Sequence, residues 1–366
     1  MSFQEIASKS LYVAFFMPLL GTALPAYGWF LLMITLACIA GKATLKGKDI
    51  IFLCYLAILF AAKVTQVGFP MAELLFRYFF GYVLVYVYCQ VTGAELNVPT
   101  LIKVYCLEVL CEATLVNTIL PATLWRNYPI ADGNMLHATK FFGFYQRPYS
   151  VGANATISSV ILVFLLLYCE IQKKNGVSGS LGRRLDWLAG ITIFSFMSGG
   201  GMVFYLFYWG YRLNLYTKWK KGLALLFFVG LCIGLAMYAS TLDSTHALSK
   251  ISMKYFDFLI DFKLNQISTT LDVLARDSWY IGANYQSDDI LLLWNDFSIR
   301  DLTHSLGFLG LAGFLIFLLI HTNRYNWMIP LLGFLCVFHY GTVFALPGAI
   351  ILAYGLELNK RKAIPL

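Results

Sequence analysis

Residues 241–303 read TLDSTHALSKISMKYFDFLIDFKLNQISTTLDVLARDSWYIGANYQSDDILLLWNDFSIRDLT, and they form the one long polar passage in a chain of 366 residues. The passage holds nine Asp, three Lys and two Arg, whereas the chain on either side is a succession of apolar runs. Three of its segments, 246–262, 267–276 and 288–300, carry apolar residues at the three- and four-residue spacing of an amphipathic helix. Such helices lie flat on a bilayer surface. We therefore expect this passage to fold as a helical cap over a membrane domain.

The composition of the whole chain predicts an integral membrane protein. Hydrophobic residues make up 59% of the sequence and charged residues 13%, and the mean hydropathy is +0.70, values typical of a polytopic membrane protein and not of a water-soluble domain. The first apolar run follows Lys9 without a small-residue cleavage pattern, so we expect no removable signal peptide. All eight Cys lie inside apolar runs, which indicates packing residues rather than disulfides or metal ligands.

The apolar runs predict an all-α bundle of about 11 to 12 transmembrane helices. Residues 11–40 are apolar for too long for one ordinary span of ~20 residues and contain Pro18 and Pro25. We interpret them as two short helices, with one kinked helix as the alternative. The other predicted spans are 50–67, 74–91, 100–121, 152–169, 185–198, 202–216, 222–239, 304–320, 327–340 and 346–356. The chain thus divides into membrane helices in 1–240 with a first outer loop at 122–151, the large outer loop 241–303, and terminal membrane helices in 304–366.

Basic residues gather in the short connections on alternate sides of the predicted spans. Because cytoplasmic loops collect Lys and Arg, these connections are predicted to be inside and both long loops outside. The net charge of +8 therefore indicates topology and gives no reason to expect nucleic acid as a partner. The residues concerned are Lys42, Lys46, Lys48, Lys173, Lys174, Arg183, Arg184, Arg212, Lys218, Lys220, Lys221, Lys360, Arg361 and Lys362.

Charged residues inside the predicted spans are candidates for function, since a Lys or Arg at the centre of a membrane helix costs ~2.5–3.5 kcal/mol. Lys63 and Arg77 lie near the outward ends of two helices joined at 68–70. Either they extend to the interface, or they attract an anionic headgroup. Glu108 and Glu112 share one helix face and are expected to pair with Lys63 or Arg77.

Two segments of the outer loops carry residues suited to a phosphate group. In 145–155, YQRPYSVGANA, Arg147 precedes a helix start that contains Gly152 and Asn154. A glycine permits close backbone approach, a helix N-terminus attracts anions, and a guanidinium offers a planar fork of donors.

The second segment runs from Arg276 through Tyr280 to the glycine-rich sequence GFLGLAG at 307–313. Arg300, Asp301 and His304 immediately precede the glycines. The alternative interpretation makes Asp301 a helix cap and His304 an interfacial residue. Neither segment contains a cluster typical of a metal site.

The order of these features resembles that of the bacterial O-antigen and capsule polysaccharide polymerases, which are relatives of the O-antigen ligases. The resemblance runs from about residue 141 to 366. It is carried by the Arg-x-x-x-x-Gly-x-Asn segment at 147–154, the Ser-rich break SFMSGGG at 195–201, Arg276 within a long outer loop, and Asp301 before the glycines. It implies a GT-C-type glycosyltransferase bundle with a helical periplasmic cap, in a bacterial inner membrane.

The implied reaction polymerises oligosaccharide repeat units linked to undecaprenyl diphosphate at the periplasmic face. It is a metal-independent, inverting glycosyl transfer that needs no cofactor. Implied partners are the lipid-linked donor and acceptor, membrane lipids, a chain-length regulator and a flippase. The product is O-antigen or capsular polysaccharide.

The resemblance also implies roles for single residues. Arg147 and Arg276 would stabilise the departing diphosphate from two distant loops meeting over one hollow, and Asp301 or His304 would accept the proton of the attacking hydroxyl. The Ser-rich break lacks the Arg that many members carry, which leaves the role of Ser198 open. The candidate substrate-binding residues are Lys63, Arg77, Gly152, Asn154, Tyr280 and Arg300.

Three alternatives to a polymerase stay open. The ligases carry a His-Asn pair where this chain has Trp294-Asn295, which favours a polymerase over a ligase. A flippase for polyprenyl-linked sugars would show paired halves and polar residues at mid-membrane, and no similarity between halves is evident in the sequence. A non-catalytic partner in envelope assembly is the third class.

Overall fold

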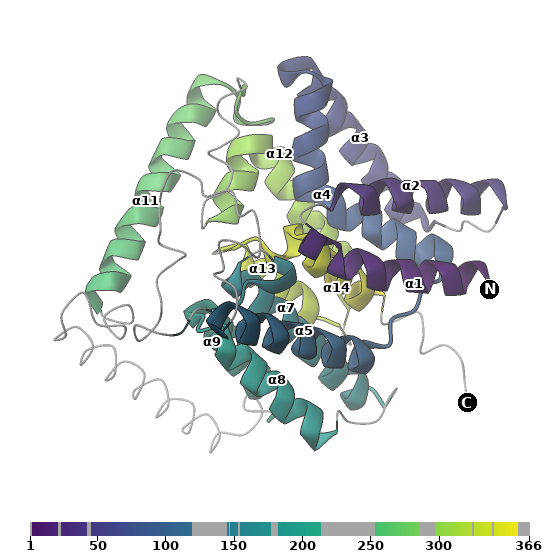
Figure 1. Cartoon of the computed structure of the whole chain (residues 1–366). Helices are drawn as coiled ribbons and strands as arrows, with labels where there is room; N and C mark the ends of the chain where they lie inside the picture. Colours follow the sequence, from purple (N-terminus) through teal and green to yellow (C-terminus); the bar gives the residue numbers. More distant parts are fainter. Residues whose placement is uncertain are drawn as a thin grey trace.

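The computed structural model describes residues 2–20, 23–41, 45–118, 145, 147–152, 154–176, 182–213, 253–285, 297–323, 326–338 and 340–357. The secondary structure of these residues is helical, without a β-strand (Figure 1). The α-helices are α1 Phe3–Phe16, α2 Leu24–Ile39, α3 Gly47–Val67, α4 Phe69–Thr92, α5 Val98–Thr118, α7 Ala155–Lys174, α8 Arg183–Ser195, α9 Gly199–Arg212, α11 Met253–Arg276, α12 Ser298–His321, α13 Met328–Cys336 and α14 Leu346–Leu356. Short 3-10 helices are η1 Met17–Leu20, η4 Ser150–Gly152 and η8 Thr342–Phe344.

Within this part of the chain, four helices are long and apolar enough to cross a membrane, namely α3, α4, α7 and α12. Two further apolar helices, α2 and α14, are shorter. The expectation of a helical membrane protein is confirmed, while the number of spans stays a prediction. The predicted span at 222–239 and most of the loop at 122–151 lie outside the described residues.

The first apolar run forms two helices. Ser2 caps α1 by accepting the N–H of Glu5, so this helix begins well before residue 11. The chain leaves the α-helical conformation at η1, which contains Pro18, and α2 begins with Pro25 in its first turn. The interpretation as two helices is therefore correct, with an earlier start than expected.

The pair α3 and α4 reverses direction at one glycine. Gly68 has a φ of +81°, a conformation that suits glycine because it lacks a Cβ. Pro70 follows in the first turn of α4, where a missing N–H has no cost. The sequence GFP at 68–70 therefore joins two membrane helices by a tight turn, as the sequence predicts.

Helices α3 and α12 are antiparallel and are tied together near both ends. At one end His321 Nε2 lies 2.9 Å from Asp49 Oδ1, and Lys48 donates to the carbonyl of Ile320. Fourteen residues further along α3, about 21 Å at 1.5 Å per residue, Lys63 contacts the chain that packs on α12.

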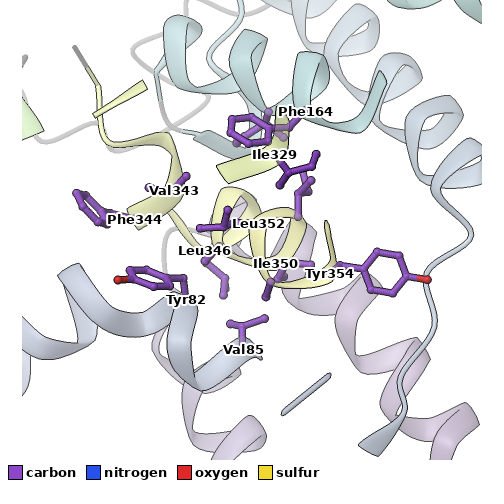
Figure 2. Close-up of a cluster of buried hydrophobic side chains, with 14 of the residues drawn as sticks. Tyr82, Val85, Phe164, Ile329, Val343, Phe344, Leu346, Ile350, Leu352 and Tyr354 are labelled. Atoms are coloured by element: carbon purple, nitrogen blue, oxygen red, sulfur yellow. The ribbon is translucent and has the colours of Figure 1, made fainter. Parts of the chain in front are cut away.

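The centre of the bundle is α14, whose eleven residues are all buried. Figure 2 shows the side chains of α14 facing residues of α4, α7, α13 and η8: the labelled members are Leu346, Ile350, Leu352 and Tyr354 of α14, with Tyr82, Val85, Phe164, Ile329, Val343 and Phe344. At about 1.5 Å per residue, α13 and α14 are each too short to cross a bilayer. The predicted terminal segments 327–340 and 346–356 are thus helical but short, and α14 is enclosed by protein.

The polar passage contributes one long helix, α11, which runs along the edge of the molecule and packs on α12 (Figure 1). The sequence predicts two amphipathic pieces, 246–262 and 267–276. That division is wrong because residues 263–266, KLNQ, contain no helix breaker, and the helix continues through them. Residues 246–252 and 286–296 lie outside the described part.

Candidate functional site

Helix α12 is interrupted at Gly307, which has φ +65° and ψ −167°. This conformation is essentially restricted to glycine. The interruption divides α12 into the parts 298–306 and 308–321. Carbonyl groups just before Gly307 and N–H groups just after it therefore lack their usual hydrogen bonds within the helix. Inside a membrane, such groups must form hydrogen bonds with other parts of the protein.

The partners come from residues 277–285, which connect α11 toward α12. Three backbone hydrogen bonds join this segment to the interruption: Ala283 N–H to the His304 carbonyl at 2.8 Å, Phe308 N–H to the Trp279 carbonyl at 2.9 Å, and Leu309 N–H to the Tyr280 carbonyl at 3.1 Å. Gly282, with φ +81°, crosses Gly307 closely. A Cβ on Gly282 would lie 2.6 Å from the His304 carbonyl oxygen, and one on Gly307 would lie 2.3 Å from that of Tyr280. Two glycines are therefore required at this crossing.

Lys63 of α3 holds the same segment from the other side. Its side chain is fully buried. The ammonium donates to Gln66 Oε1 at 2.7 Å and to the carbonyls of Ile281 at 3.0 Å and Ala283 at 2.6 Å. Gln66 Nε2 in turn donates to the Gly282 carbonyl at 2.9 Å. The alternative in which Lys63 extends to the interface is wrong, because these acceptors hold its charge inside the protein.

Arg276 and Asp277 form the outer edge of this site. Arg276 Nε donates to Asp277 Oδ1 at 2.9 Å, and the other carboxylate oxygen accepts the N–H of Asn284 at 2.8 Å. The guanidinium of Arg276 and this N–H lower the pKa of Asp277 below its ordinary value. The Arg276 side chain is 73% exposed, so its guanidinium is accessible to an anion from outside.

His304 lies beside the interruption and is buried. Its Nδ1 is 2.7 Å from the hydroxyl of Tyr285, which is also 2.9 Å from Ser305 Oγ. The Lys63 ammonium lies 5.8 Å from the centre of the Tyr285 ring. The described structure therefore places an imidazole within a hydroxyl network next to a buried cation.

Arg300 and Asp301 form a buried ion pair in the first turn of α12. Arg300 Nη1 donates to Asp301 Oδ1 at 3.0 Å, and Arg300 Nε donates to Thr270 Oγ1 of α11 at 2.8 Å. Since α12 begins at Ser298, with Phe297 in the capping position, the interpretation of Asp301 as a helix cap is wrong. This pair instead fastens α11 to α12 with a carboxylate near the positive end of the helix dipole.

A second group of predicted residues lies between α5 and α7. The Glu112 carboxylate accepts the N–H groups of Tyr149 at 3.0 Å and Ser150 at 2.9 Å, and Ser150 Oγ donates to Glu108. The Arg147 guanidinium lies 5.9 Å from the Tyr149 ring centre. The carboxylates thus fix the backbone next to Arg147, which the sequence pattern did not predict.

The cations expected to pair with these carboxylates have other partners. Lys63 binds the acceptors named above, and Arg77 Nη1 donates to Glu73 at 2.9 Å, one turn earlier in α4. The expected pairing of Glu108 or Glu112 with Lys63 or Arg77 is therefore wrong. Helix spacing favours the Arg77–Glu73 contact, since residues four apart share a face.

The start of α7 is capped from within the chain. Asn154 Oδ1 accepts the N–H of Thr156 at 2.7 Å, and the Gly152 N–H donates to Ser158 Oγ at 2.9 Å. A Cβ on Gly152 would lie 2.6 Å from Ser158 Oγ, so this glycine serves close packing. The Gly152 and Thr156 N–H groups at this helix start are thus bonded to protein.

The Ser-rich break separates α8 from α9, as the sequence predicts. Ser198 caps α9 by accepting the Gly201 N–H at 3.1 Å, and it donates to Thr156 Oγ1 at 2.8 Å. Tyr145 donates to the Ser195 carbonyl at 2.6 Å. Ser198 thus has a structural role, and the break holds the segment around Arg147.

The described contacts gather the predicted residues into two groups. Lys63, Arg276, Tyr280 and His304 belong to the site around 277–285, and Arg300 with Asp301 lies one turn before His304. Arg147, Gly152 and Asn154 belong to the group on α5 and α7. The meeting of Arg147 and Arg276 over one hollow stays a prediction. In the part of the chain that the structure describes, no group of three or more His, Cys, Asp or Glu is arranged to hold a metal ion.

Fold and site together define an α-helical membrane protein with a buried polar site at an interrupted membrane helix. No family model, curated protein or solved structure matches the chain.

Proposed function

We propose that the protein is a membrane glycosyltransferase that polymerises oligosaccharide units carried on undecaprenyl diphosphate. The observation that carries this proposal is the buried His304 and Tyr285 pair beside the interruption of α12, with the exposed guanidinium of Arg276 at the edge of the same segment. Glycosyl transfer from a diphosphate needs an acid–base group and fixed cations in one place. This site offers an acid–base group, His304, and a cation, Arg276, on two segments that are joined by backbone hydrogen bonds.

In the proposed reaction, an acceptor hydroxyl attacks the anomeric carbon of the donor sugar. The new carbon–oxygen bond forms as the bond to the diphosphate breaks, and the electron pair leaves with the diphosphate. His304 accepts the hydroxyl proton, and Arg276 stabilises the negative charge that develops on the departing phosphate. Direct displacement inverts the anomeric carbon.

The contacts of Asp301 and His304 favour His304 as the base of the proposed reaction. Asp301 already accepts from Arg300 in a buried pair that ties α11 to α12. His304 lies at the interruption, and its Nδ1 forms a hydrogen bond with the hydroxyl of Tyr285. An imidazole nitrogen can accept a proton near neutral pH. We therefore assign the proton transfer to His304 and a positioning role to Asp301. Arg147 is proposed as the second cation, brought from the segment fixed by Glu112.

Deletion of the gene tests the function through the length of the surface glycan. A polymerase deletion leaves glycans with a single repeat, whereas loss of all repeats indicates a flippase. Complementation with His304→Gln tests the site, with His321→Gln as its matched control, because His321 is a buried histidine on the same helix bonded to Asp49. We expect single repeats from His304→Gln and polymer from His321→Gln. Full-length glycan from His304→Gln would refute the assignment of the base.

A transporter of lipid-linked sugars is the second candidate, favoured by the interrupted helix itself. Transporters form substrate sites at discontinuous membrane helices, and here buried charged residues flank the interruption. The deletion experiment separates the two, since a transporter deletion abolishes surface repeats altogether.

A further inference from the structure

Helix α11 has three different faces along the part whose side chains are described, 260–276. At about 100° per residue, positions three and four apart share a face of a helix. The first face packs on α12: Thr270 and Leu274 are buried, and Thr270 accepts a hydrogen bond from Arg300. This face fixes the rotation of α11 about its own axis.

The second face is an exposed row of aliphatic side chains, which we call the aliphatic stripe. It consists of Ile260, Leu264, Ile267 and Leu271, at spacings of four, three and four residues, and their exposed fractions are 56%, 59%, 39% and 40%. The stripe is turned by roughly 70° from the face that packs on α12. Four large aliphatic residues in one row are unfavourable in water.

The third face is polar and exposed. It carries Asp261, Asn265, Ser268, Asp272 and Arg276. It lies roughly 120° from the aliphatic stripe and on the far side from α12. The helix thus presents one side to protein, one to an apolar medium and one to water, as an interfacial helix attached to a membrane domain does.

Exposed aromatic side chains also follow the end of α11, where it meets α12. Trp279 stacks on Phe308 of α12 with ring centres 5.8 Å apart and planes 2° from parallel, and both rings are partly exposed. Tyr280 beside them is also exposed. Trp and Tyr are enriched where a membrane protein meets the bilayer surface. The exposed Leu309, Ile316 and Leu319 follow Phe308 on α12, which as a whole is long and apolar enough to cross the membrane.

We infer that the aliphatic stripe of α11 lies in the membrane interface and is covered by phospholipid acyl chains. The position of α11 at the edge of the molecule agrees with this placement (Figure 1). The lipid surface then fixes α11 in the plane of the bilayer, while Thr270 and Arg300 fix its side against α12. The inference depends on the membrane class of the protein and is independent of the proposed reaction.

Photo-crosslinking in native membranes tests the inference on the full chain. A benzophenone amino acid is placed at Leu264 or Leu271 on the stripe, and at Asp261 or Asp272 on the polar face as matched controls in the same helix. After irradiation, the mass of the intact protein shows what was captured. We expect an adduct of one phospholipid at the stripe positions, at least tenfold more abundant than at the polar positions.

Three results would overturn the inference: equal lipid adducts on both faces, a crosslink from the stripe to another protein chain, or no adduct at the stripe. Only variants that reach the membrane at the wild-type level are compared. Ile267 replaces any stripe position that fails this criterion, so a folding defect at one position does not decide the outcome.

Discussion

Substitution of Gly307 by alanine is expected to destabilise the protein through the crossing of two backbones. The new Cβ would lie 2.3 Å from the Tyr280 carbonyl oxygen and 2.6 Å from the Gly282 nitrogen, so no side-chain rotation relieves the contact. A non-glycine residue in this backbone conformation costs ~1–3 kcal/mol. Separation of the two segments also loses three backbone hydrogen bonds, each worth ~1 kcal/mol net. Together these effects predict a loss of about 4–6 kcal/mol, a large fraction of the stability of a typical protein.

Unfolding the purified protein in detergent with heat or denaturant measures this loss of stability. Gly28→Ala is the matched control, because Gly28 lies inside α2 with open space around its Cβ position, and alanine there favours the helix. The double variant Gly282→Ala with Gly307→Ala gives a second test, since both glycines serve one crossing. We expect the double variant to lose clearly less than the sum of the single losses. A Gly307→Ala protein as stable as Gly28→Ala, or strictly additive losses, would refute the crossing as the source of the requirement.

Three other predictions concern single side chains. Lys63→Met leaves the carbonyls of Ile281 and Ala283 without their donor and should lower the free energy of unfolding by about 2–4 kcal/mol. Arg77→Met is the control and should lower it by less than ~1 kcal/mol, because the Arg77–Glu73 ion pair is partly exposed. Equal losses in the unfolding assay would contradict this prediction. Glu112→Ala leaves two N–H groups unpaired and should expose the segment 145–152 to protease about tenfold faster than in the wild type, as measured by limited proteolysis. The lowered pKa of Asp277 means that its contribution to stability is present above the ordinary aspartate value of about 4 and is lost as the pH falls below it. The protection of the Asn284 amide against hydrogen exchange, taken relative to its intrinsic rate at each pH, should therefore decrease below that pH, and Asp277→Asn should abolish this decrease.

Periodicity and hydropathy predict which parts of the chain are helical, because both follow from local sequence. The starts and ends of α3, α4 and α9 are close to the expected ones, and the turn at 68–70 follows from its glycine and proline. The same signals predict the bounds of α14 but not what surrounds it. An apolar sequence is the same whether lipid or protein surrounds the helix that it forms. Only the packing of α4, α7 and α13 against α14 shows that protein surrounds it.

The site was predictable in its residues but not in its contacts. Glycine and charge drew attention to 276–284 and 300–307, and those two stretches meet in the structure. The roles of Lys63 and Glu112 as holders of backbone groups were not predictable, because their acceptors and donors are peptide groups, which every residue has. Tyr285 carried no signal beyond its place at the end of the segment.

Enclosure of α14 has a consequence for the order of assembly during synthesis. Residues 346–356 leave the ribosome after the helices that surround them, so the inward surfaces of those helices cannot reach their native contacts until this segment has been made. Until then, the inward surfaces of α4 and α7 have only one another or lipid as neighbours. The bundle therefore reaches its native arrangement when its central helix arrives, and slow passage of that segment from the translocation channel would delay the whole molecule.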